Sequence, residues 1–207
     1  MERAEIKQWA KEKIKGHIWE LLIPILVAGI LTGLTIGGKT TYEDGQFQTT
    51  AGINLGFFLY FVTVGLVSFI KAFNNDQPHE FKDLFKFAND YVRIFLTNLL
   101  QSIFIFLWAL LLIVPGIMKA FSYALVPYIL ADEKYKDMKA MDILKLSETM
   151  MKGHRMDYFV FGLSYFGWFL LGAITCGLAF IYVAPYFTVA QVKFLDEVKT
   201  KYESENK

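Results

Sequence analysis

Long apolar segments alternate with shorter polar ones along the chain. Three of them reach the length of about 20 residues that an α-helix needs to cross about 30 Å of hydrocarbon. Three more follow, of which the first is short and the last two are separated only by Cys176 and Gly177. The six segments are 18–38, 51–73, 94–114, 117–131, 157–175 and 178–195. The pattern predicts an all-α polytopic membrane protein with about six transmembrane helices arranged as three hairpins.

The basic residues test this count, because Lys and Arg beside short loops stay on the cytoplasmic side of the membrane. Nineteen of the 21 Lys and Arg residues fall in the two tails, between the second and third spans, or between the fourth and fifth spans. Only Lys39 and Lys119 fall on the opposite side. The distribution predicts six spans with the N- and C-termini in the cytoplasm.

The second hairpin contains the dipeptide Pro115-Gly116, which is expected to form its outer turn. Proline presets φ for a turn and glycine tolerates positive φ. Lys119 then lies just inside the returning arm, close enough for its amine to reach outward to water. A proline hinge within the membrane is the alternative. Cys176, the single cysteine, falls in an outer turn and has no partner for a disulfide within the chain.

The polar segments before the hairpins are related in sequence. A shift of residues 140–157 back by 137 positions aligns Lys152-Gly153-His154 with Lys15-Gly16-His17. A shift of the same segment by 59 positions aligns it with residues 81–98. Each segment has the apolar periodicity of an amphipathic helix. We therefore predict a single membrane domain over 1–207, with internal repeats 1–73, 80–131 and 140–195. Each repeat is an amphipathic cytoplasmic helix followed by a membrane hairpin.

Amphipathic helices with Lys-rich flanks are expected to lie in the headgroup plane, with the apolar face in lipid. Their cations would then contact the anionic headgroups of the bilayer. They serve either as anchors that orient the hairpins, or as a surface that senses lipid or docks a partner.

The charged and histidine residues do not indicate an enzyme. The chain is 55% hydrophobic with net charge +1, which gives no attraction to nucleic acid. All 20 carboxylates lie in loops, tails or ends of spans, whereas ion-coupled transporters usually bury an ionisable group. His17, His79 and His154 are expected to be interfacial or packing residues, because no metal-ligand spacing joins them. We expect no catalytic residue, no cofactor and no metal.

Polar residues within the apolar segments indicate a ligand-binding cleft on the cytoplasmic side. Pro127 and Pro185 lie at matching depth, each is followed by Tyr, and proline kinks a membrane helix. The predicted ligand-binding residues are Asn98, Gln101, Ser122, Tyr123, Pro127, Tyr128, Pro185, Tyr186 and Gln191. The alternative is that the prolines shape helix packing and the tyrosines belong to the interfacial aromatic belt.

The run VPGIMKAFSYALVPYILAD at 114–132 and the run from LKLSETMMKGHRMDYF to IYVAPY at 144–186 resemble a known family. It is the bacterial integral membrane family catalogued as domain of unknown function 975. The features that carry the resemblance are Pro115-Gly116, Pro127-Tyr128, Asp132, Leu146-Ser147, Gly153-His154, Trp168 and Pro185-Tyr186. The resemblance implies a multi-pass protein of bacterial plasma membranes and supplies no reaction and no catalytic residue.

The sequence therefore predicts a non-enzymatic bacterial plasma-membrane protein that binds a lipid, another amphipathic ligand or a membrane partner. The membrane partner would be a different protein or a second copy of this chain. A small transporter or channel working as an oligomer is the alternative, although the apolar spans contain no continuous polar path. An accessory or immunity-type protein against membrane-active peptides is also compatible, but no motif points to it.

Overall fold

The computed structural model of the 207-residue chain describes residues 3–36, 39–43, 46–50, 53–111, 113–175 and 177–205. It is mainly helical, as predicted. The longer helices are α1 (Arg3–Lys13), α2 (Ile18–Gly33), α3 (Tyr60–Asn74), η2 (Phe81–Asp90), α4 (Tyr91–Leu111), α5 (Ile113–Ser122), α7 (Ala140–Met150), α8 (Arg155–Leu163), α9 (Phe166–Ile174) and α10 (Phe180–Glu205). Three short helices connect them: η1 (Leu55–Phe57), α6 (Val126–Leu130) and η3 (Glu133–Tyr135).

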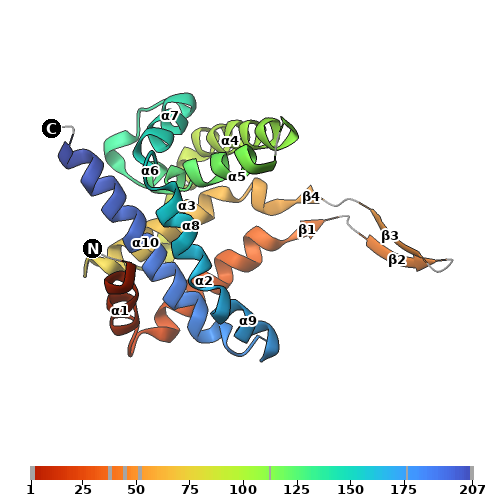
Figure 1. Cartoon of the computed structure of the whole chain (residues 1–207), viewed down its shortest axis with the longest axis horizontal. Coiled ribbons are helices and arrows are strands. Elements are labelled where there is room, and N and C mark those ends of the chain that lie inside the picture. The colour runs from red at the N-terminus through yellow and green to blue at the C-terminus, as the bar shows by residue number, and fades with distance from the viewer. Residues whose placement is uncertain are drawn as a thin grey trace.

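The helices form three antiparallel pairs that extend from a shared region. α2 pairs with α3, α4 with α5, and α9 with α10 (Figure 1). The distal ends of the three pairs point apart, whereas both chain termini lie on the other side of the molecule (Figure 1). The structure thus contains three pairs of packed helices, and that these are three membrane hairpins stays a prediction.

Fewer helices than predicted are long and apolar enough to cross a membrane. Two helical stretches in the described part of the chain qualify, Phe81–Leu110 with 30 residues and Arg155–Ile174 with 20. A third counts if α1 and α2, which meet at an angle of 106°, are taken as one broken span. The apolar helix α3 has only 15 residues. These findings indicate membrane association. They do not confirm the predicted count of six crossings.

The first predicted hairpin ends in short strands, which the sequence analysis did not predict. The strands are β1 (Thr35–Ile36), β2 (Lys39–Glu43), β3 (Gln46–Thr50) and β4 (Ile53–Asn54). β1 pairs with β4 and β2 with β3, both antiparallel, with Glu43 opposite Gln46. The segment is rich in Thr, and Asp44-Gly45 separates β2 from β3 in the sequence. Both features favour a β-hairpin over a helix end.

Pro115 and Gly116 do not form the outer turn of the second pair. Both lie within α5, so they are helical residues of the returning arm. Pro115 is the third residue of α5, where a missing N–H breaks no helical hydrogen bond. A Cβ on Gly116 would lie 2.7 Å from the Cα of Ala109. The glycine therefore permits the close approach of α5 to α4.

The amphipathic helices pack on the protein and not on lipid, contrary to expectation. Two apolar residues of each helix are almost fully buried: Ile6 and Ala10 in α1, Leu84 and Phe87 in η2, and Ile143 and Leu144 in α7. Phe81 and Phe85 of η2 and Met141 of α7 stay exposed. α1 packs against α10, η2 against α3, and α7 against α4 and α6. The apolar faces of these helices are satisfied within the fold because other helices of the same chain cover them.

The breaks after α1 and α7 have the same local structure. Gly16 has φ +84° and Gly153 has φ +90°. At each break the residue after glycine donates its backbone N–H to the carbonyl three residues earlier: His17 to Ile14 and His154 to Met151, both at 3.1 Å. The following histidine side chain lies near an acid three positions on, Glu20 or Asp157. The sequence match at a shift of 137 positions thus corresponds to a local structural match.

Candidate functional site

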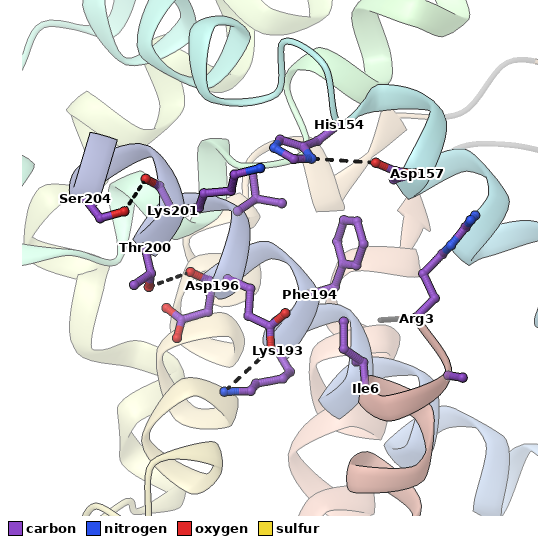
Figure 2. Close-up of a pocket in the computed structure, with 13 residues that line it drawn as sticks. Arg3, Ile6, His154, Asp157, Lys193, Phe194, Asp196, Thr200, Lys201 and Ser204 are labelled. Carbon is purple, nitrogen blue, oxygen red and sulfur yellow. Dashed lines mark hydrogen bonds and ion pairs between the residues drawn. The ribbon is translucent and has the colours of Figure 1, made fainter. Parts of the chain in front are cut away.

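A hollow of about 980 Å³ lies between α1, the start of α8 and the C-terminal half of α10 (Figure 2). Ile6, Phe194 and Val198 give it an apolar lining, and each of them is buried. Charged side chains complete the lining, including Arg3 from α1 and Lys201 from α10. The hollow thus combines apolar and charged walls within the volume range of ligand pockets.

Each acid that lines this hollow lies near a basic side chain of the chain. Asp157 lies 3.7 Å from His154 Nδ1, Asp196 lies 3.6 Å from Lys71 Nζ, and Glu197 lies 4.0 Å from Lys193 Nζ. Arg3 and Lys201 are both exposed, and neither has a carboxylate partner among the residues that the structure describes. The lining thus holds as many acids as Lys and Arg residues, and Arg3 and Lys201 are the two cations that these acids leave unpaired.

A second cluster joins His17, Glu20 and His79. The Glu20 carboxylate lies 2.9 Å from His17 Nδ1 through one oxygen and 2.8 Å from His79 Nε2 through the other. The ring of Phe73 packs edge-on against both histidines. A smaller hollow of about 450 Å³ borders the cluster. His79, which seemed isolated in the sequence, is thus connected to the first helix break.

The cluster is better suited to holding a proton than a metal. Each imidazole points a nitrogen at the Glu20 carboxylate, and within the described ranges no group of three or more His, Cys, Asp or Glu has the geometry to hold a metal ion. Burial alone would lower the pKa of His79, but the Gln77 carbonyl and the Glu20 carboxylate outweigh it and raise that pKa. Acidic conditions therefore favour the charged form of His79 in this cluster.

A buried ion network joins α3, α10 and the segment after α6. The Lys199 ammonium donates to the Asp132 carboxylate, and only 5% of the Lys199 side chain is exposed. Lys71 lies between Asp132, at 3.9 Å, and Asp196, at 3.6 Å. Burial alone would raise the pKa of Asp132, but hydrogen bonds from Lys199 and from the Lys134 N–H outweigh it and lower that pKa. The network fixes the C-terminal helix on the protein core.

Lys119 does not reach outward as the sequence suggested. Its Nζ donates to Glu148 Oε1 of α7 at 2.7 Å, and Glu148 Oε1 also lies 3.7 Å from Arg155 Nη2. The Lys119 ammonium lies over the rings of Trp108 and Tyr123, 5.4 and 5.8 Å from their centroids. The expectation was wrong because α7 packs along the α4–α5 pair and supplies a carboxylate.

The nine residues predicted to bind a ligand are spread over the core. Asn98, Ser122, Tyr123, Tyr128, Pro185 and Tyr186 are buried. The Tyr186 ring packs against Tyr165 and Trp168, with centroids 5.1 and 6.3 Å away. None of the nine lines the two hollows described above. The cleft stays a prediction, and packing accounts for Tyr128 and Tyr186 in this structure.

Hydrogen bonds explain several of the polar residues in this set. Asn98 Nδ2 donates to the Phe57 carbonyl at 3.2 Å, and Gln191 Nε2 donates to the Tyr158 hydroxyl at 2.6 Å. The Ser122 carbonyl accepts from Ser147 Oγ at 2.8 Å. Gln101 Oε1 is buried and has no partner in the described part of the chain. Pro127 lies in the first turn of α6, where the missing N–H is tolerated.

Sequence reasoning missed the hollow and the ion network. The pairing of Glu20 with His79 and that of Asp132 with Lys199 join residues 59 and 67 positions apart. The sequence did contain one local signal for these contacts: an acid follows a histidine by three positions twice, at His17 and Glu20 and at His154 and Asp157. On a helix this spacing brings two side chains together.

The fold and its charges define a mainly helical, membrane-associated protein with apolar helical pairs and ion networks at their shared region. Residues 110–202 match the family described as "Protein of unknown function (DUF975)". The match confirms, over this segment, the family resemblance drawn from the sequence. No curated protein and no solved structure matches the chain.

Proposed function

We propose that this chain is a non-enzymatic, multi-pass protein of the bacterial plasma membrane that binds an amphipathic lipid ligand at its cytoplasmic side. Both termini lie in the cytoplasm, and the three helical pairs enter the bilayer with their divergent ends first. The distribution of the basic residues supports this orientation.

The observation that carries the proposal is an exposed apolar side chain at the second position of α2, α4 and α8. Trp19 is 69% exposed, and Val92 and Met156 are each 68% exposed. Single exposed apolar residues are ordinary on soluble proteins. Here, however, they begin longer apolar surfaces that continue along the same helices, at Ile23, Leu26, Leu96, Phe106, Phe159 and Leu163. Contiguous apolar surface of this kind is typical of contact with a membrane.

The divergent ends of the helical pairs favour lipid between them. The fully buried residues of α4 lie in its first half, at Ile94 and Thr97, whereas Ile103, Phe106 and Leu110 in its second half are exposed. α9 likewise exposes Phe166, Leu170 and Ile174. In a bilayer, acyl chains would fill the space that water cannot occupy at low free energy.

Six crossings in three repeats remain part of the proposal. The equal backbone conformation at Gly16 and Gly153 supports a common origin for the first and third repeats. α5 and α6 together cover residues 113–130, and α10 extends from Phe180 to Glu205. Both are long enough for a span when short breaks and tilting are allowed.

The orientation can be tested with the single cysteine. In intact cells that produce the protein, a membrane-impermeant maleimide should label Cys176. In a Cys176→Ser, Ser204→Cys variant, it should label Cys only after the cells are permeabilised. Labelling of the Ser204→Cys variant in intact cells would contradict the proposed topology.

The ligand can be tested by native mass spectrometry of the protein extracted in mild detergent. We expect a phospholipid bound in a fixed ratio that survives stepwise activation in the gas phase. The control is an unrelated multi-pass protein from the same membranes, which reports non-specific lipid carry-over. Lipid binding equal to that of this control would refute the binding function and leave the membrane topology untouched.

A further inference from the structure

Two cations that line the hollow of α1, α8 and α10, Arg3 and Lys201, are not paired with the acids that line it too. Figure 2 shows Arg3 on one side of the hollow, Lys201 on the other, and His154 between them at its upper edge. Because Asp157, Asp196 and Glu197 are paired with other side chains, an anion entering the hollow would meet Arg3 and Lys201 first. Such a geometry favours an anion with several acceptor oxygens, since Arg presents a fork of donors and Lys a compact charge.

The hollow borders the apolar surface that begins on α8. Asp157 lines the hollow, and its neighbour Met156 is 68% exposed. One turn further along α8, Phe159 and Val160 are also exposed. An amphiphile can therefore place its charged group in the hollow while its acyl chains follow α8 into the bilayer.

The apolar part of the lining is matched to the remainder of such a ligand. Ile6, Phe194 and Val198 lie beside the charged rim, where the small exposed parts of their side chains can contact the non-ionic part of a bound headgroup. A soluble inorganic anion would use the cations alone. The neighbouring apolar surface therefore argues for a phosphoryl group that is attached to an acylated glycerol.

We propose that this hollow binds the phosphoryl group of an anionic phospholipid headgroup, held between Arg3 and Lys201. The proposal rests on the proposed function and names its ligand class and its site. It predicts that the hollow, and not the nine-residue cleft, determines the lipid affinity.

The test titrates purified protein in mild detergent with short-chain phosphatidylglycerol and, separately, with glycerol phosphate and inorganic phosphate. Arg3→Gln and Lys201→Gln should each weaken phosphatidylglycerol binding about 5-fold, and the double variant about 25-fold, because each cation near a lipid surface contributes a similar amount. The loss should shrink at high salt, where exposed charges are screened. Lys11→Gln combined with Lys145→Gln is the control, because it removes the same charge from exposed positions that do not line the hollow.

The outcomes separate the site from the function. Equal phosphatidylglycerol affinity of the double variant and the wild type would overturn the proposed site, even if lipid still copurifies and the binding function stands. An equal loss in the control variant would also overturn it, because the effect would then reflect net charge. Glycerol phosphate binding as tightly as the lipid would support the phosphoryl site and identify a soluble phosphate ester as its ligand. The absence of lipid from the wild-type protein would refute the proposed function itself.

Discussion

His79 Nε2 lies 2.8 Å from Glu20 Oε1, although the two residues are 59 positions apart. The second oxygen of the same carboxylate lies 2.9 Å from His17 Nδ1. The contact joins the first turn of α2 to the loop between α3 and η2. A second ion pair, Lys13 with Asp76 at 2.5 Å, joins the end of α1 to the same loop. The bend between α1 and α2 is thus held from outside by charged and titratable groups.

We predict that the contribution of His79 to stability depends on pH. Its pKa is raised in the folded protein, since Gln77, Glu20 and Asp83 outweigh the effect of burial. The stabilisation is therefore present below the unfolded pKa of about 6.5 and is lost as the pH rises through the folded pKa. His79→Gln should lower the free energy of unfolding by about 0.5 kcal/mol more at about pH 5.5 than at about pH 8.5.

Thermal unfolding in mild detergent at the two pH values measures this difference. Glu20→Gln should reduce it, because the variant removes the carboxylate that both histidines share. A His79→Gln effect that is equal at both pH values would show that the contact does not depend on charge.

The helix breaks give a second prediction. Gly16 and Gly153 have positive φ and no atom within 4 Å of an added Cβ, so conformation is the only reason for glycine there. Gly16→Ala and Gly153→Ala should each lower the free energy of unfolding by about 1 kcal/mol. Gly162→Ala is the control, because Gly162 lies within α8 with equally open surroundings and ordinary φ. It should be neutral or stabilise by up to about 1 kcal/mol. Equal effects at all three positions would refute the conformational argument.

A third prediction concerns the close packing of α3 against η2. An added Cβ at Gly65 would overlap the backbone carbonyl of Leu84, which is itself fully buried. The backbone cannot move aside as a flexible side chain would, so Gly65→Ala should lower the free energy of unfolding by at least about 2 kcal/mol. Gly29→Ala in α2, where the surroundings are open, is the control for the same chemical change. Similar thermal stabilities of the two variants would mean that η2 does not pack as described.

Periodicity predicted the helical pairs well, because each apolar segment is long and bounded by polar residues. It did not predict the short strands of the first pair, because the Thr-rich segment 39–50 was expected only to connect two spans. It also placed the amphipathic helices on lipid. The period of an amphipathic helix is the same whether its apolar face meets lipid or another helix, and Ile6 and Ile143 prove to face protein.

The sites were harder to predict because their members come from distant parts of the chain. Arg3 and Lys201 are ordinary charged residues in the sequence, and only the packing of α1 on α10 brings them to one hollow. Tyr128 and Tyr186 stood out because each follows a proline, yet the structure buries both in the core. Asp132 stood out through the family resemblance, and its contacts with Lys199 and Lys71 now supply a physical role.

The last prediction tests that role with a double-mutant cycle. Asp132→Asn alone would leave the buried Lys199 ammonium without its carboxylate and should lower the free energy of unfolding by about 3 kcal/mol near pH 7. Lys199→Met should cost less, because Asp132 is 21% exposed and keeps Lys71 at 3.9 Å. Adding Asp132→Asn to Lys199→Met should then cost only about 1 kcal/mol, which gives a coupling energy of about 2 kcal/mol.

The acid dependence of the same cycle provides its independent check. The pKa of Asp132 is lowered in the folded protein, so its stabilisation is present above the unfolded pKa of about 3.9 and is lost as the pH falls through the folded pKa. The difference between the wild type and Asp132→Asn should therefore shrink in acid, while that between Lys199→Met and the double variant stays small throughout. Additive effects of the two substitutions would show that Asp132 and Lys199 act separately. The anchoring of α10 would then have to come from its apolar contacts with α1, α2 and α3.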